Sequence, residues 1–160
     1  MAVRLIATDL DGTIVRSDGE ISERTVRTLQ AAEAAGLLVV FVTGRPPRWM
    51  KPVSDATGHT GLAICANGAV VYDLHTEQVV EEFPMDAEVA RKLAAEHGIT
   101  ADQVVAFGDM PNDVPMLRWA GHAVAVGNAH PEVMAVVDEV TATNDEDGVA
   151  LVVERLLGGG

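Results

Sequence analysis

The sequence has one cysteine, two lysines and no apolar run long enough to cross a membrane. A lone cysteine, Cys65, cannot form an internal disulfide, which suits a reducing cytosol. Because it lies in an apolar stretch, we interpret it as a small buried hydrophobe. No signal peptide is expected, since Arg4 and Asp9 interrupt the N-terminal apolar stretch. These scarcities predict a cytoplasmic protein without a membrane-spanning segment.

Basic residues are also few. The chain has 11 lysines and arginines and 24 acidic residues, which gives a formal net charge of −13. A negative net charge of this size repels nucleic acids and anionic membranes, so we expect neither as a partner. It repels a phosphorylated substrate as well. A substrate of that kind would need a divalent cation in an acidic site.

Polar residues follow the ends of four apolar runs. Residues 3–7, apolar apart from Arg4, lead into Asp9-Leu10-Asp11-Gly12-Thr13. The other three runs precede Thr43-Gly44-Arg45, Asn67-Gly68 and Asp109-Met110-Pro111-Asn112-Asp113. In an open parallel sheet all carboxyl ends lie on one edge, so these side chains are expected to converge there. An ordinary Asp-Gly turn remains the alternative for the first of them.

Strands alternate with helices along most of the chain. The predicted helices span residues 23–36 (with Ser22 as N-cap and Gly36 as the stop), 46–58, 85–97, 112–120, 131–137 and 147–157. Predicted strands beyond residue 110 cover 122–126 and 140–141. This order is typical of an α/β fold, a Rossmann-like doubly wound parallel sheet, in one core domain over residues 1–157. Gly158 to Gly160 should form a disordered tail, and Trp49 and Trp119 should pack helices onto the sheet.

One interval, residues 70–83, breaks the alternation. Residues 70–73 and 78–83 resemble strands, and the four residues between them resemble a turn, so we expect a β-hairpin.

In this order the motifs resemble the haloacid dehalogenase superfamily of phosphatases, specifically its Cof-type branch of sugar-phosphate and phosphoglycolate phosphatases. Asp9 to Thr13, Thr43 to Arg45 and Gly108 to Asp113 carry most of the resemblance. Residues 65–69, 124–129 and 141–148 extend it over nearly the whole chain. In that family a cap domain is inserted where residues 70–83 form the predicted hairpin. The chain resembles a core domain without its cap, either a natural capless member or a cap-deleted form.

The resemblance implies how the acidic residues act. Asp9 would be the nucleophile that forms an aspartyl-phosphate, and Asp11 the general acid that protonates the leaving alcohol and later activates water. Mg²⁺ would be held by Asp9, by the backbone carbonyl of Asp11 and by Asp109, with Asp113 behind.

Phosphate oxygens would be held by Thr43, by the Gly44 N–H and by the N–H groups after Asp11, including that of Gly12. Purely structural roles remain as alternatives: a strand-end turn for Thr43 and Gly44, and a helix N-cap for Asp109.

Three more residues are weaker candidates for phosphate binding. An Asn-Gly turn would explain Asn67, helix capping would explain Asn112, and Arg45 could simply cover the sheet edge with its stem.

One position departs from the family pattern. Asp86 occupies the place of the lysine that stabilises the nucleophile and the phosphate charge in the family. Arg45, Lys51, Lys92 or a basic residue of a neighbouring subunit could substitute.

Two functions therefore remain. The first is a Mg²⁺-dependent phosphatase acting on a small phosphorylated metabolite, and the second is a weak or inactive relative that binds Mg²⁺ and a phosphorylated ligand. Because a capless site is open to water, we further predict that the hairpin packs across a symmetric interface in a homodimer or tetramer.

Overall fold

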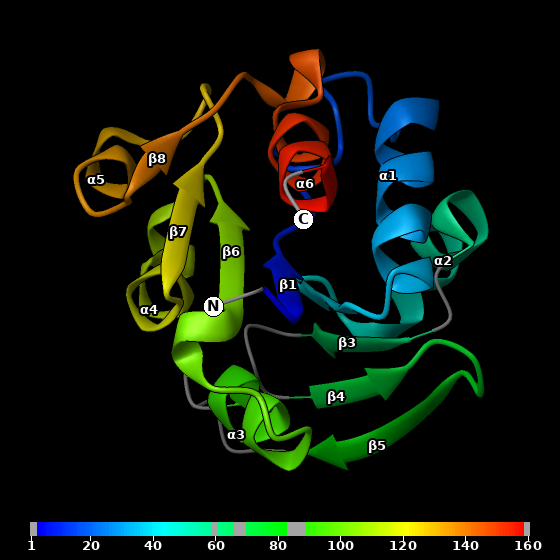
Figure 1. The fold of residues 1–160 in the computed structure, drawn as a ribbon. Helices are drawn as coiled ribbons and strands as arrows, with labels where there is room; N and C mark the ends of the chain where they lie inside the picture. The colour runs from blue at the N-terminus through cyan, green and yellow to red at the C-terminus, as the bar shows by residue number, and fades with distance from the viewer. Residues whose placement is uncertain (1–2, 59–60, 66–69, 83–88, 159–160) are drawn as a thin grey trace.

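The core of the fold is a sheet whose central strands are short and almost entirely buried. The computed structural model describes residues 3–58, 61–65, 70–82 and 89–158 (Figure 1). The strands are β1 (Leu5–Thr8), β2 (Leu38–Val42), β3 (Leu62–Cys65), β4 (Val70–Asp73), β5 (Gln78–Glu82), β6 (Val104–Gly108), β7 (His122–Ala125) and β8 (Glu139–Val140). Their order in the sheet is β5-β4-β3-β2-β1-β6-β7-β8. The six strands that run from β3 to β8 in this order are parallel, as predicted. Each crossover returns the chain to the end of the sheet at which the previous strand began.

The register of the central strands brings their carboxyl ends level with one another. Thr8 at the end of β1 pairs with Phe41 of β2 on one side and with Phe107 of β6 on the other. Residues that follow these three strands therefore meet at one edge of the sheet. This is the place where open α/β sheets bind ligands.

Six α-helices in the described residues accompany the sheet. They are α1 (Glu23–Ala34), α2 (Lys51–Thr57), α3 (Val89–Glu96), α4 (Val114–Trp119), α5 (Pro131–Met134) and α6 (Gly148–Gly158). In Figure 1, α1, α2 and α6 cover one face, whereas α3, α4 and α5 lie on the other. The Ser22 cap is confirmed, since its side chain accepts the Thr25 N–H. We predicted a disordered tail from Gly158 onward, but Gly158 is the last residue of α6. Residues 159–160 lie outside the described residues.

The predicted hairpin is present, and its turn falls at residues 74–77 as expected. However, β4 pairs antiparallel with β3, so the hairpin extends the main sheet and does not stand apart from it. This leaves β5 as an edge strand with Val79 and Val80 exposed. Phe83, which we assigned to the hairpin, lies outside the described residues.

The two tryptophans differ in their surroundings. Trp119 is partly buried against the core, as predicted. The same prediction for Trp49 is wrong, because 56% of its surface is exposed. The short 3-10 helix η1 (Pro47–Trp49) precedes α2, and the next residue, Met50, is the one that is fully buried.

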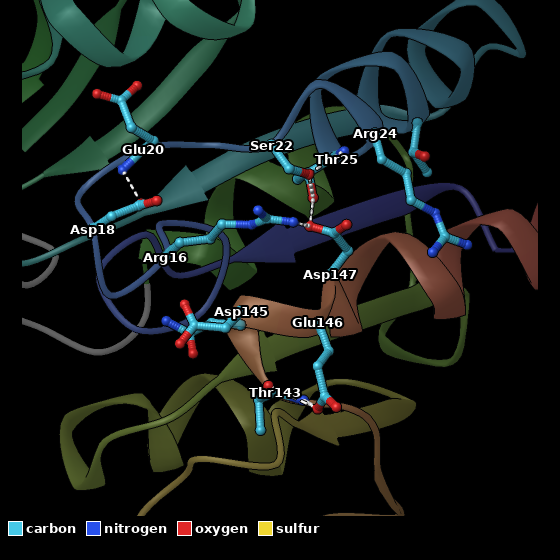
Figure 2. A network of polar contacts seen from close by, with 12 residues as sticks. Arg16, Asp18, Glu20, Ser22, Arg24, Thr25, Thr143, Asp145, Glu146 and Asp147 are labelled. Atoms are coloured by element: carbon cyan, nitrogen blue, oxygen red, sulfur yellow. Dashed lines mark hydrogen bonds and ion pairs between the residues drawn. The ribbon is translucent and has the colours of Figure 1, made fainter.

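The turn after β1 is attached to the segment before α6 by a polar network (Figure 2). The Arg16 guanidinium lies 2.7 Å from Asp147, and the backbone N–H and hydroxyl of Ser17 donate to Asp145 at 2.8 and 2.7 Å. Asp147 ends the 3-10 helix η5 (Asn144–Glu146) with a φ of 59°. The acidic motif at residues 144–148 therefore holds the loop that follows β1 in place.

Candidate active site

Three buried carboxylates meet at the carboxyl edge of the sheet. Asp9 directly follows β1, Asp109 directly follows β6, and Asp113 lies in the 3-10 helix η4 (Pro111–Asp113). One carboxylate oxygen from each lies within 4.8 Å of the other two. The sequence brings them together because β1 and β6 are neighbours in register.

Asp113 and two glycines shape this cluster. The Oδ2 of Asp113 accepts the backbone N–H groups of Asp109 and Met110, each at 3.0 Å, and so closes the loop. A Cβ on Gly108 would lie 2.6 Å from that of Asp113. At Gly12, where φ is +82°, a Cβ would lie 2.3 Å from Oδ2 of Asp109. Only glycine permits the two loops to approach this closely.

Burial and mutual repulsion disfavour the charged forms of these acids. Burial, together with the charges of Asp113 and Asp109, raises the pKa of Asp9 to about 8. Burial and the charge of Asp113 raise the pKa of Asp109 to about 6, and burial raises the pKa of Asp113. A cation bound among the three acids would therefore stabilise their charged forms at neutral pH.

The donor set fits a hard divalent cation. Oδ1 of Asp109 is buried and has no hydrogen-bond partner among the described residues, although buried carboxylate oxygens are normally paired. Three carboxylates within ligand reach of one another are the oxygen donors that such cations prefer. The side chain of Asp11 is not part of this group.

A pocket of about 290 Å³ opens beside the carboxylates. Its lining comes from the ends of β1, β2 and β6 and from η1 and η4: Asp9, Asp11, Thr43, Gly44, Arg45, Trp49, Asp109, Met110, Asn112 and Asp113. The Arg45 guanidinium donates to both oxygens of Asp11, from Nε at 2.7 Å and from Nη2 at 2.5 Å. This hydrogen-bonded pair raises the pKa of Arg45. Arg45 therefore does more than cover the sheet edge with its stem.

The turn and cap roles considered for Asp109, Thr43 and Asn112 fit the structure to different degrees. Asp109 is not a helix cap, since η4 has Met110 at its N-cap position. The Thr43 hydroxyl does close a strand-end turn, accepting the Arg45 N–H at 3.1 Å, but Thr43 also lines the pocket. Asn112 is exposed at the pocket, whereas Asn67 and Asp86 lie outside the described residues.

Arg45 is the one cationic side chain that lines the pocket in the described part of the chain. Lys51 lies 2.7 Å from Glu77 in the hairpin turn and 3.6 Å from Asp55. Lys92 lines a different hollow, between α3 and the hairpin.

Sequence reasoning assigned no role to Asn128 and Asn144, which brace the loop after β1 from behind. The Asn128 amide donates to the Gly12 carbonyl at 2.8 Å and accepts the Asn144 N–H at 2.9 Å. The buried Asn144 amide in turn donates to the Val15 carbonyl at 2.9 Å. Thr13 adds a hydroxyl 3.2 Å from Oδ2 of Asp9. The resemblance to the family included the motifs at residues 124–129 and 141–148, which contain these two asparagines. It did not indicate which backbone groups they bind.

Comparison with known proteins decides the family. The model of the haloacid dehalogenase-like hydrolase family matches residues 6–96 and 87–153. The chain belongs to this family. It is 26% identical to a phosphoglycolate phosphatase of Methanothermobacter thermautotrophicus, with 98% of this chain and 100% of that protein covered. It is 37% identical to a 5-amino-6-(5-phospho-D-ribitylamino)uracil phosphatase of Bacillus subtilis, with 91% and 94% covered.

The solved structures agree on the fold. A haloacid dehalogenase-like hydrolase from Bacteroides thetaiotaomicron superimposes with a TM-score of 0.87 at 21% identity, covering 96% of this chain and 99% of that one. None of the helices in the described residues combines the length and apolar character needed to cross a bilayer.

The alignments also measure what this chain lacks relative to other family members. The alignment to the archaeal relative runs over 220 residues and that to the Bacillus relative over 255, whereas this chain has 160. The relatives therefore carry at least 60 and 95 residues without a counterpart here. This agrees with a haloacid dehalogenase-like core that lacks a cap.

Proposed function

We propose that this chain is a Mg²⁺-dependent phosphatase that hydrolyses a small phosphorylated metabolite through an aspartyl-phosphate on Asp9. The class of enzyme, a phosphoric monoester hydrolase, comes with the family. The observation that carries the finer proposal is the cluster of Asp9, Asp109 and Asp113, in which a buried oxygen of Asp109 lacks a partner among the described residues. The phosphatases among its relatives support a small phosphate ester as the substrate.

In this proposal Asp9, the Asp11 carbonyl, Asp109 and Asp113 hold the cation, which when bound neutralises phosphate charge. Asp9 attacks the phosphorus atom, and the bond from phosphorus to the leaving oxygen breaks. Asp11 gives that oxygen a proton. Water then attacks the phosphorus atom of the aspartyl-phosphate while Asp11 takes a proton from it, and Asp9 is released as a carboxylate.

The phosphoryl oxygens would be bound by the Gly12 and Gly44 N–H groups and the Thr43 hydroxyl, with Asn112 and Asn67 as further candidates. Arg45 would take the place of the family lysine whose position Asp86 occupies. Its guanidinium binds Asp11 through both oxygens, and an incoming phosphate offers the same two-oxygen geometry with more charge. A substrate that draws Arg45 away would leave the Asp11 carboxyl able to exchange a proton.

A second candidate function rests on the same ion pair. If Arg45 remains on Asp11 when a phosphate binds, Asp11 cannot act as an acid, and the protein would bind Mg²⁺ and a phosphorylated ligand with little turnover.

We also propose a reducing, cytoplasmic compartment. Cys65 is fully buried, and burial raises the pKa of its thiol to about 12, so it is an inert core residue that needs no disulfide partner.

Hydrolysis of p-nitrophenyl phosphate separates the two functions. The phosphatase should release p-nitrophenol with Mg²⁺ and lose this activity with EDTA and in the Asp9→Asn variant. A wild-type protein that binds Mg²⁺ and phosphate but releases no product would favour the second function.

A further inference from the structure

Two large apolar side chains are exposed at the mouth of the pocket. Trp49 has 56% and Met110 47% of its surface exposed, and both line the same hollow as Asp9 and Asp11. Exposed apolar side chains are common singly, but two of them beside a cluster of buried acids form one continuous site. The chain has only two tryptophans, and the other packs against the core.

The indole of Trp49 contacts the side chain of its neighbour. The Arg48 guanidinium lies over the ring, 5.5 Å from its centroid, a distance at which a cation and an aromatic face attract each other. In the described residues, no segment covers the exposed part of Trp49. The pocket, at about 290 Å³, is close to the smallest volumes that hold small ligands.

We propose that Trp49 binds the leaving group of the substrate and selects phosphate esters of aromatic or heteroaromatic alcohols. This inference rests on the proposed function, which places the phosphoryl group at Asp9 and therefore points the rest of the ester toward the mouth. A flat ring there stacks on the indole, and the Met110 thioether contacts its edge. In a chain without a cap, the core itself then supplies the recognition of the leaving group.

Two esters of similar size test the ring preference. Benzyl phosphate and cyclohexylmethyl phosphate release primary alcohols of similar bulk, but only the first is aromatic. Wild type should have a KM for benzyl phosphate about tenfold lower, equivalent to about 1.4 kcal/mol. Trp49→Ala should remove this difference by raising KM for the benzyl ester, because stacking acts alike on ground and transition states. Trp49→Phe, which keeps a ring, should retain most of the preference.

Binding without turnover provides a second readout. In Trp119→Phe, Trp49 is the only tryptophan left, so its fluorescence reports on the site. Benzylphosphonate should quench this fluorescence in the presence of Mg²⁺ and bind about tenfold more tightly than cyclohexylmethylphosphonate, the same factor as for the esters.

The outcomes separate this inference from the proposed function. If wild type hydrolyses both esters with equal KM, or Trp49→Ala changes both equally, the ring preference is wrong and the phosphatase stands. If neither these esters nor p-nitrophenyl phosphate is hydrolysed but benzylphosphonate still quenches Trp49 selectively, the phosphatase is wrong and the aromatic site stands.

Discussion

The carboxylate of Asp9 is buried between two other carboxylates, which costs free energy unless a cation shares the site. The same oxygens that repel one another are the ligands that a hard divalent cation requires. Asp109 is the most informative of the three, because its buried Oδ1 is left without a partner among the described residues.

Replacing Asp109 should therefore weaken metal binding. Calorimetry should find that Asp109→Asn lowers the Mg²⁺ affinity by at least about tenfold, or about 1.4 kcal/mol, because a charged ligand is lost. Asp11→Asn is the matched control, since the Asp11 side chain points to Arg45 and only its backbone carbonyl is assigned to the cation. Equal Mg²⁺ affinity in wild type and Asp109→Asn would refute the site.

Arg45 should be the cation that replaces the family lysine. Converting it to Met should lower kcat/KM by roughly two orders of magnitude, about 2.7 kcal/mol, the scale of one lost electrostatic contact to the reacting group. Lys51→Met and Lys92→Met serve as controls, because both lysines lie away from the pocket. A loss confined to Lys92→Met would instead assign the role to α3.

At the scale of elements, the loop after β1 is held by side chains from two distant segments. Asn128 follows β7 and Asn144 opens η5, and together they bind the carbonyls of Gly12 and Val15. This loop presents Asp9 and Asp11, so its backbone must be fixed before a substrate arrives.

Asn128→Ala should lower the free energy of unfolding by about 1–3 kcal/mol, because it removes two hydrogen bonds of about 0.5–1.5 kcal/mol each, one to the Gly12 carbonyl and one from the Asn144 N–H. It should also lower kcat at saturating substrate. Arg24→Ala is the control: it removes the exposed ion pair with Glu154 between α1 and α6, which contributes little to stability, and it should leave kcat unchanged. Loss of stability with an unchanged kcat in Asn128→Ala would show that the brace is purely structural.

These elements also show what the sequence could predict. The positions of β1, β2 and β6 could be predicted, because each is an apolar run that ends at a polar residue: Asp9, Thr43 and Asp109. Pairing partners are not encoded in that pattern, so the attachment of the hairpin to β3 was missed. The exposure of Trp49 depends on the exact turn of η1, and the contact of Asn128 with Gly12 spans 116 residues.

For the whole molecule, the acid cluster should make stability depend on pH in the absence of metal. An unfolded Asp titrates near 3.8, whereas Asp9 and Asp109 keep their protons up to about 8 and about 6 in the folded state. The folded state thus binds more protons between these values, so stability falls as pH rises through this range.

Chemical denaturation with EDTA should therefore give a lower free energy of unfolding at pH 8 than at pH 5. Asp9→Asn should be more stable than wild type at pH 8, by more than about 1 kcal/mol, because it removes the charge with the most raised pKa. A wild-type stability that rises from pH 5 to pH 8 in EDTA would contradict the cluster's raised pKa values.

Assembly remains a prediction at this scale. Strand β5 ends the sheet with Val79 and Val80 exposed, and such an edge favours pairing with a second copy. Light scattering at micromolar concentration should find a dimer or tetramer for wild type and a smaller species for Val80→Glu. A monomeric wild type would exclude the interface.

The most direct test of the account is to trap the phosphoryl group on Asp9. Wild type mixed with Mg²⁺ and excess benzyl phosphate, quenched in acid within milliseconds and digested, should contain a peptide phosphorylated at Asp9. Asp9→Asn should contain none and should release no alcohol. Turnover by wild type without a phosphorylated Asp9, or turnover by Asp9→Asn at the wild-type rate, would contradict the mechanism.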